Sequence, residues 1–428
     1  MQRRDFLKLA GALGLTGALP TIYMQAHAAD GLFNGKIFLT MHAGGGWDHS
    51  SFGDPRENPS INHWADTQKA GVAGNLRYAP MAENGQFFDK YKDFMLVVNG
   101  IDLQTNGHAA ATRHRNTGNL MGGYTSLNEL YAAISASGTP MPFVRAGGFD
   151  GNEGMAPFTA LPDENLIRTL SNPNFGGTDK TVYAKSHMDI LQKYKQERLK
   201  AQKKYHKNLP RWHEKLNELD VARLGTSELE QLGSFLPDSL DRQDLKGDNR
   251  GEVRGLHLFL AMAAAGMTAT ASFSTGGWDT HGDHDNRHTN ALVNMTRSLD
   301  YLWTKADNMG LADRLIVHVT SDVGRTPHYN ANNGKDHWSV GHDIVMMKNA
   351  PWANRIVGAS GSGHQRQKID PTTLKVDNES GIYLRPKHVH QALRSLLGIQ
   401  DHEFSKRYDL NAETLPLFDP SLSTGIQV

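Results

Sequence analysis

The chain has 428 residues, which is enough for one large domain or two ordinary ones. Lysine plus arginine and aspartate plus glutamate both total 45, so the charge balance gives no indication of nucleic acid or an anionic membrane as the main partner. The absence of cysteine excludes disulfides and leaves histidine, carboxylate and hydroxyl side chains as the groups that could hold a metal ion.

The N-terminus has the features of an export signal. Arg3 and Arg4 precede a weakly apolar stretch, and Ala26-His27-Ala28 forms a small-x-small cleavage site. This order is typical of a twin-arginine signal; the alternative is a basic N-terminal helix or an uncleaved anchor. We expect residues 1–28 to be removed after passage through the twin-arginine translocase, leaving a periplasmic or secreted protein with no membrane span.

Short apolar runs that end abruptly in polar or glycine-rich sequence alternate with helical patterns along the chain. The runs predict buried parallel strands at 36–41, 94–99, 268–274, 315–320 and 343–347. The helical patterns cover residues 109–121, 126–136, 253–265, 290–308 and 387–397. Together they predict an α/β fold with a largely parallel mixed sheet sandwiched by helices, occupying residues 29–428 as one domain.

Residues 182–234 differ from this pattern because they are rich in Lys, Glu, Gln and Leu. We expect one or two long helices, interrupted at Pro210, that form an insertion on the α/β core. Such a charged segment is most often a solvated helical face, and the alternative is a docking surface for a partner. The stretches 146–180 and 236–251 are rich in Gly, Pro, Asn and Asp, which predicts long surface loops.

Polar clusters follow the ends of the predicted strands, where ligands bind in open α/β sheets. After strand 36–41, three glycines lead to Asp48, a candidate metal ligand. After strand 268–274, Asp279 and His281 stand two residues apart, so in an extended segment both could grip one ion. Further candidates are His284, Asp285 and His288, of which His284 and His288 would lie on one face if a helix starts there.

A third cluster follows strand 315–320. Asp322 stands at the strand end, and Arg325 is suited to bidentate contact with an anionic group, the alternative being a structural salt bridge. Asp336, His337 and His342 come after a turn-rich excursion, and a histidine from this segment could complete the coordination of an ion.

A fourth cluster lies after strand 94–99, where a helix is expected to begin near His108. Helix N-termini attract anions, and a hydroxyl nucleophile could be aimed at an anion bound there. Thr105 lies before this end and Thr112 about one turn inside the helix. Thr112 could instead face the core.

Taken together, the segments RRDFLK, GGGWD, GWDTHGDH, SDVGRTP and KDHW, in this order, resemble the bacterial exported family known as domain of unknown function 1501. That family is similar to the alkaline phosphatase and sulfatase superfamily. The resemblance runs over nearly the whole chain and implies an alkaline phosphatase-like fold with divalent ions at one sheet edge. It implies that the ligands are Asp48, Asp279, His281, Asp322 and His337, with Asp336 as an alternate or supporting ligand.

Two positions depart from the pattern of these families. Val323 stands where the superfamily has a histidine ligand, and typical members of the exported family have Glu and Phe at 322 and 323. Gly107 precedes His108 where many members have Ser followed by His, so the expected nucleophile is missing. Thr105 or Thr112 would have to replace it, or water activated by a divalent ion would attack directly.

The sequence therefore favours a periplasmic, metal-dependent hydrolase of phosphate or sulfate esters. One or two divalent ions (Zn, Mn, Ca or Mg) would be the cofactor, and the substrate would be an anionic small-molecule or polysaccharide ester. His108 and Arg325 would steady the anionic group. The competing interpretation is a non-catalytic exported binding or assembly protein that keeps the fold without the nucleophile. A third interpretation, scattered surface polar groups, predicts that the candidate ligands do not converge.

Overall fold

A computed structural model describes residues 33–147, 153–161, 181–207 and 250–422, together with single positions between these ranges. The predicted export signal and its cleavage site lie outside the described residues, as do most of residues 208–249 and of the loops expected within 146–180 and 236–251. Among the described helices, none is both long and apolar enough to cross a membrane.

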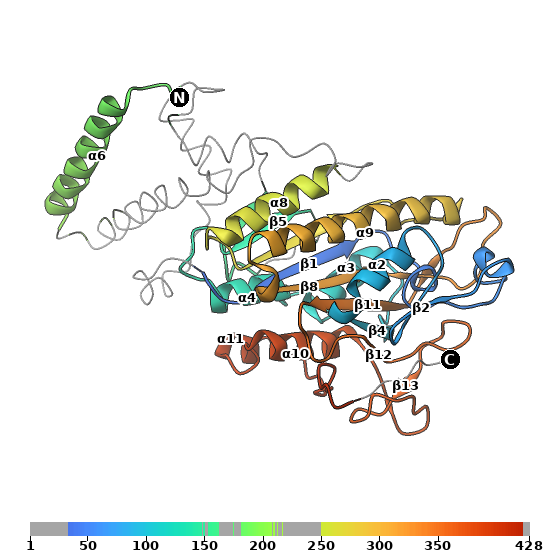
Figure 1. Ribbon diagram of the computed structural model, residues 1–428. Helices are drawn as coiled ribbons and strands as arrows, with labels where there is room; N and C mark the ends of the chain where they lie inside the picture. Colours follow the sequence, from blue (N-terminus) through green and yellow to red (C-terminus); the bar gives the residue numbers. More distant parts are fainter. Residues whose placement is uncertain are drawn as a thin grey trace.

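One large sheet organises the described part of the chain (Figure 1). It has eight strands in the order β12-β4-β11-β8-β1-β7-β5-β6. Their bounds are β1 (Ile37–Ala43), β4 (Met95–Asp102), β5 (Phe143–Ala146), β6 (Phe158–Ala160), β7 (Thr270–Thr275), β8 (Leu315–Ser321), β11 (Val340–Met347) and β12 (Arg355–Val357). The predicted α/β class with a largely parallel mixed sheet is confirmed, and β5, β6 and β12 are strands that the sequence analysis did not predict.

The fifth predicted run is a strand, but its expected parallel direction is wrong. β11 pairs antiparallel with both of its neighbours, β4 and β8. Every pairing on the other side of β8, from β8–β1 through β1–β7 and β7–β5 to β5–β6, is parallel. The reason is that no crossover helix separates β8 from β11. The chain instead passes through a small hairpin, β9 (Gly324–Arg325) and β10 (His337–Trp338), and then runs back beside β8.

Helices cover both faces of the sheet (Figure 1). Alternating side chains of β1 show the two faces: Ile37, Leu39 and Met41 pack in one core and Phe38 in the other. The first core also contains α2 (Asn84–Tyr91), α8 (Arg250–Ala264) and α9 (His284–Asn308); the second contains α4 (Leu127–Ser135) and α10 (Pro386–Leu397). The remaining helices are α3 (His108–Thr117), α6 (Lys185–Tyr205) and α11 (Glu403–Arg407).

Two helix boundaries differ from the prediction by four residues or more. α3 ends at Thr117 instead of continuing to residue 121, because Gly118 adopts a left-handed conformation (φ 78°) that closes the helix. α9 begins at His284, six residues before the predicted start at 290, directly after Asp283 in a left-handed conformation (φ 47°).

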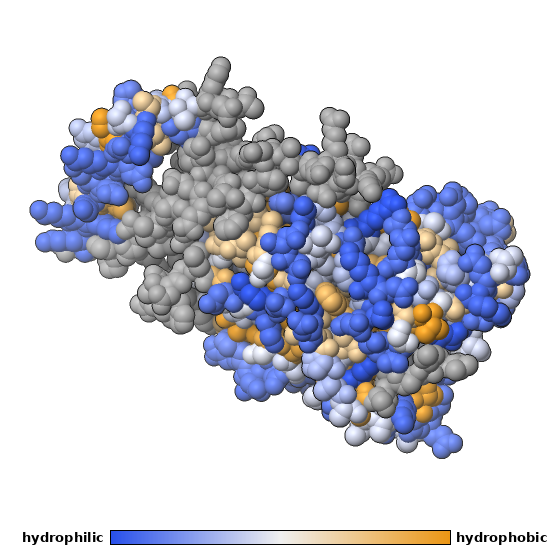
Figure 2. All heavy atoms as spheres, in the orientation of Figure 1, coloured by the Kyte–Doolittle hydropathy of each residue, from blue (hydrophilic) through white to orange (hydrophobic). Residues whose placement is uncertain are grey.

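The predicted insertion contributes one described helix, α6, which lies apart from the sheet in Figure 1. The face of the molecule drawn in Figure 2 is mostly hydrophilic over the described residues, with hydrophobic side chains scattered among them. The small elements complete the structure and do not enter the sheet. They are η1 (His49–Ser51), η2 (His63–Asp66), η3 (Lys92–Phe94), η4 (Ala312–Arg314), β2 (Gly71–Ala73), β3 (Leu76–Tyr78), β13 (Lys368–Ile369) and β14 (Ile382–Tyr383).

Candidate functional site

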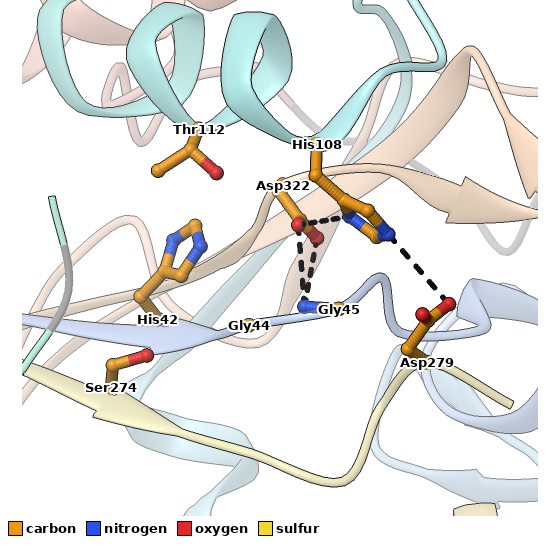
Figure 3. A pocket seen from close by; sticks show the side chains of 8 residues that line it. All are labelled: His42, Gly44, Gly45, His108, Thr112, Ser274, Asp279 and Asp322. Atoms are coloured by element: carbon orange, nitrogen blue, oxygen red, sulfur yellow. Dashed lines mark hydrogen bonds and ion pairs between the residues drawn. The ribbon is translucent and has the colours of Figure 1, made fainter.

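Four segments that are distant in sequence meet at the carboxyl ends of the parallel strands. They are the loops after β1 and β7, the β8–β9 junction with its β10 partner, and the start of α3 after β4. A shallow pocket of about 380 Å³ opens at this edge (Figure 3). It is lined by His42, Gly44, Gly45, His108, Thr112, Ser274, Asp279 and Asp322.

Histidine nitrogens converge on one carboxylate oxygen beside this pocket. Asp279 Oδ1 lies 3.0 Å from His281 Nε2, 3.4 Å from His337 Nε2 and 3.7 Å from His108 Nε2. His281 Nε2 and His337 Nε2 are 3.1 Å apart. We call these four residues, His108, Asp279, His281 and His337, the outer cluster.

Each outer histidine has its other ring nitrogen directed at an acceptor. His281 Nδ1 lies 2.8 Å from Asp336 Oδ1, His337 Nδ1 2.9 Å from the Asn106 carbonyl, and His108 Nδ1 2.6 Å from Asp322 Oδ2. Carbonyls and carboxylates only accept, so each Nδ1 carries the hydrogen and, in a neutral ring, each Nε2 carries a lone pair. Metal-ligating histidines are held in the same way.

The lone pairs of the histidine Nε2 atoms face the negatively charged carboxylate of Asp279 and would repel it unless a positive charge lay between them. A divalent ion would supply that charge, and imidazole and carboxylate groups are donors that such ions accept. Ligand atoms bound at about 2.0–2.2 Å around a tetrahedral ion stand roughly 3.4 Å apart. His108, Asp279 and His337 each offer an atom within 4.8 Å of the others, and His281 Nε2 is closer still to two of them.

The charge state of the outer cluster suits coordination. Burial acts to raise the pKa of Asp279, but its hydrogen bond and charge interaction with Arg325 outweigh this and lower the pKa. Burial, followed by the charge on His108, lowers the pKa of His337. Asp279 is therefore ionised and His337 neutral at neutral pH, which are the forms that bind metal ions.

Arg325 is fully buried beneath the outer cluster and donates hydrogen bonds to several of the segments that form the site. Its Nη2 donates to Asp279 Oδ1 at 2.7 Å and to the Gly45 carbonyl, its Nε donates to the Gly46 carbonyl at 2.9 Å, and its Nη1 to the Lys335 carbonyl at 2.9 Å. These bonds tie the β1 loop, the hairpin and Asp279 together. In this geometry the guanidinium is directed at protein atoms, as in the salt-bridge alternative.

Asp322 is 3% exposed and lines the pocket. Its carboxylate accepts from the amides of Gly45 at 3.2 Å and Val323 at 2.8 Å, and from His108. Figure 3 shows His108 between Asp322 and Asp279. Asp322 thus orients the imidazole of His108, which belongs to the outer cluster.

Asp48 is not brought to the outer cluster. Its carboxylate is 1% exposed and accepts from Lys335 Nζ at 2.6 Å, His284 Nε2 at 3.0 Å and Ser50 Oγ at 2.6 Å. Burial acts to raise the pKa of Asp48, but the Lys335 ammonium and His284 bring it well below its usual value. The positive charge that balances Asp48 is therefore a lysine, and its oxygens are occupied by protein donors.

The structure also places the predicted hydroxyls. Thr112 lines the pocket, whereas Thr105 is half-buried before α3 and accepts a hydrogen bond from the Gly107 amide at 3.2 Å. Two lining residues were not predicted from the sequence, His42 and Ser274, which are opposed on neighbouring strands. Burial lowers the pKa of His42 to about 4, so it is neutral at pH 7. Polar residues alternating within these apolar strands were the signal that could have found them.

The fold and the site together define an α/β protein with a histidine- and carboxylate-rich centre, suited to a divalent ion, at the ligand-binding edge of its sheet. The chain matches the family described as "Protein of unknown function (DUF1501)" over residues 184–374, which confirms the resemblance seen in its motifs. No curated protein matches the chain.

Solved structures to which the chain is similar include sulfatases and an alkaline phosphatase. One is from a study of glycosaminoglycan metabolism by Bacteroides thetaiotaomicron (8% identity, 91% of this chain and 77% of that one, TM-score 0.42). Another is a sulfatase from Pseudoalteromonas sp. (10% identity, 92% of this chain and 73% of that one, TM-score 0.37). A third is the alkaline phosphatase of the Antarctic bacterium TAB5 (9% identity, 76% of this chain and 94% of that one, TM-score 0.33). At these TM-scores the function has to be argued from the site.

Proposed function

We propose that this protein is an exported, metal-dependent hydrolase of phosphate or sulfate esters. The observation that carries the proposal is the outer cluster, in which three Nε2 atoms with acceptor-bound Nδ1 groups face one ionised carboxylate oxygen beside an open pocket. Catalytic zinc sites typically have three protein ligands and keep a fourth position open for water or substrate. The exposed side of the outer cluster provides that position, since the Asp279 side chain is 51% exposed.

The residues around the pocket have complementary tasks. Asp279, His281, His337 and His108 would hold the ion, while Asp336, Asp322 and Arg325 fix the orientation of these ligands. When bound, a divalent ion would neutralise charge on the ester and make an attacking water more acidic. The N-terminal end of α3, which begins at His108, directs free amides and a positive dipole end toward the same edge and favours an anionic group.

Thr112 and Ser274 are the hydroxyls that line the pocket, and His42 lies with them (Figure 3). We assign attack on the ester to one of these hydroxyls or to water. His42 is neutral beside them, so its ring can accept a hydrogen bond that orients an attacking hydroxyl or water. Thr105 does not line the pocket and would serve α3 as a turn residue.

The test is to purify the protein, measure bound metal by elemental analysis, and screen aryl phosphates and aryl sulfates for turnover. Asp279→Ala should lose the outer ion and at least about 100-fold of the activity, since even supporting residues of metal sites are worth 10–100-fold. Asp401→Asn, an exposed acid outside the pocket, is the matched control and should behave as the wild type. Turnover that survives Asp279→Ala would refute the assignment of the outer cluster.

Export is proposed from the sequence of residues 1–28. Replacing both Arg3 and Arg4 by lysine should keep the protein in the cytoplasm with its N-terminal segment uncleaved, as judged by cell fractionation and the mass of the product. Unchanged export of this variant would contradict the twin-arginine assignment.

A second candidate function is metal-dependent binding or assembly without catalysis. It is favoured by Gly107 at the N-cap of α3, where a serine nucleophile would be expected from the resemblance. Val323, at the position of a superfamily ligand, is fully buried and packs close to Gly46. Stoichiometric metal without turnover of any ester, unaffected by added Zn, Mn or Ca, would favour this candidate over the hydrolase.

A further inference from the structure

A second group of histidines lies in the interior, outside the pocket. His49 follows β1 in η1, His364 lies in the turn after Ser360, and Asp54 lies in the loop after η1. His49, Asp54 and His364 each offer a ligand atom within 4.8 Å of the others. We call these three residues the inner cluster. None of them belongs to the outer cluster or lines the pocket.

The imidazoles of this region are buried without hydrogen-bond partners. His49 and His364 are 0% exposed, as is His342 of β11, whose ring centroid lies 6.1 Å from that of His49. Five of their ring nitrogens have no partner within the part of the chain that the structure describes: both of His49, both of His342 and Nε2 of His364. Buried polar groups are nearly always paired, so a concentration of unpaired nitrogens points to a missing partner.

Asp54 is the only carboxylate of the inner cluster, and it is already oriented. Its Oδ1 accepts from Arg56 Nη1 at 2.7 Å, and its Oδ2 accepts from Ser360 Oγ at 2.5 Å and lies 3.5 Å from His364 Nδ1. Burial acts to raise the pKa of Asp54, but Arg56 and His364 bring it well below its usual value. An ionised carboxylate held by a serine and an arginine matches the support that metal-ligating carboxylates receive.

The histidines are in the form that binds metal ions. Burial lowers the pKa of His342 to about 4 and the pKa values of His49 and His364 below their usual range, so all three rings are neutral at pH 7. His342 sits where the register between β11 and β4 shifts, between Gly341 and Asp343. Such a bulge re-aims a side chain relative to a regular strand.

We propose that the inner cluster is a second, closed metal site that takes a divalent ion of the Zn²⁺ type, with His49, Asp54 and His364 as ligands and His342 as the fourth. Imidazole and carboxylate donors in a four-ligand set are the donors that Zn²⁺ prefers. Bound through one nitrogen of each imidazole, the ion would be the partner of three of the five unpaired nitrogens. Because all four groups are buried, this site has no position open to a substrate, and its role is to stabilise the packing of the β1 loop against β11 and the 360–364 turn.

The experiment measures zinc stoichiometry in the full chain after equilibration with Zn²⁺ and removal of free metal. The outer variant is Asp279→Asn with His281→Gln, and the inner variant is His49→Gln with His364→Gln. His187→Gln, an exposed histidine on α6, is the matched control. We expect two ions in the wild type and the control, and one in each double variant.

A spectroscopic measurement covers the case in which the inner variant does not fold. In the outer variant, Co²⁺ should give the intense visible bands of a tetrahedral site, and zinc X-ray absorption should show an imidazole-rich shell. A wild type with one ion that only the inner substitutions remove supports the inner site and refutes the outer one. An outer variant that folds but binds no ion, or an inner variant that folds with its full zinc content, overturns the proposal.

Discussion

The outer and inner clusters are built from the same residue types but differ in access and in hydrogen bonding. In the outer cluster His281 is 46% exposed and its Nδ1 is bonded to Asp336, whereas in the inner cluster His49 is fully buried with both ring nitrogens unpaired. A solvent-facing set of oriented ligands suits exchange of water and substrate, and an enclosed set suits a permanent ion. The roles proposed for the two clusters therefore depend on solvent access as well as on ligand chemistry.

The largest effect is expected at the buried ion pair of Lys335 and Asp48. Lys335→Met leaves the Asp48 carboxylate buried without its ammonium, which should lower the free energy of unfolding by about 3–5 kcal/mol in urea titrations. Lys90→Met, in an exposed pair with Asp300, is the control and should have little effect. A Lys335→Met protein of undiminished stability that binds an extra ion would return Asp48 to the set of metal ligands.

Chelation should separate the two clusters by their effect on stability. Removing the inner ion from the outer variant should cost about 4 kcal/mol if zinc is present at 1,000 times its dissociation constant, or roughly 5 °C in Tm for a chain of this length. The same chelator should lower the Tm of the inner variant less, because the exposed outer cluster is expected to bind its ion more weakly than the enclosed inner cluster. Calorimetry of both variants with and without chelator checks this, and a shift in the outer variant no larger than that in the inner variant would contradict the expected stabilising role of the inner ion.

A smaller effect is expected from a supporting residue of the outer cluster. Asp336→Asn removes the charge that holds His281 Nδ1, while the amide can still accept a hydrogen bond. Metal affinity at the outer cluster should fall about 10–100-fold, measured by competition with a chromophoric chelator. The inner site of the same protein is the internal control and should keep its zinc.

The smallest effect concerns α3, which carries His108 at one end and the buried His114 further along. Burial lowers the pKa of His114 to about 4, despite its bond to the Leu103 carbonyl at 3.0 Å. Its stabilising contribution is therefore present above pH 6.5 and is lost as the pH falls from 6.5 toward 4, by about 1 kcal/mol between pH 7 and 5.5.

His114→Gln tests this assignment, because glutamine can still donate to the Leu103 carbonyl but does not titrate. The free energy of unfolding of the variant should change less than that of the wild type between pH 7 and 5.5. An equal loss in both proteins would assign the acid sensitivity to other groups.

The fold was largely predictable because its signals are local. Apolar runs that end in glycine or polar residues located β1, β4, β7 and β8, and helical periodicity located α4, α8 and α10. The direction of β11 was not predictable, since a short run carries no information on which way its neighbours run. Gly118 was visible in the sequence as a helix terminator, and the periodicity that continued past it misled the prediction of α3.

The site was predictable where its residues follow parallel strands. Asp279, His281 and Asp322 were expected at one sheet edge for that reason, and the structure places them there with His337. The separation of Asp48 from them was not predictable, because Lys335 reaches it from 287 positions along the chain. The inner cluster depends on the turn that carries His364, whose position relative to β1 no sequence pattern encodes.

The reversed direction of β11 has a consequence for how such sheets are searched for ligands. A strand that runs backward presents its first residues, and not its last, at the edge where its parallel neighbours end, and His342 stands among those first residues. In chains of this architecture, imidazoles and carboxylates at the beginning of an antiparallel strand are therefore candidate ligands, just like those that follow the parallel strands.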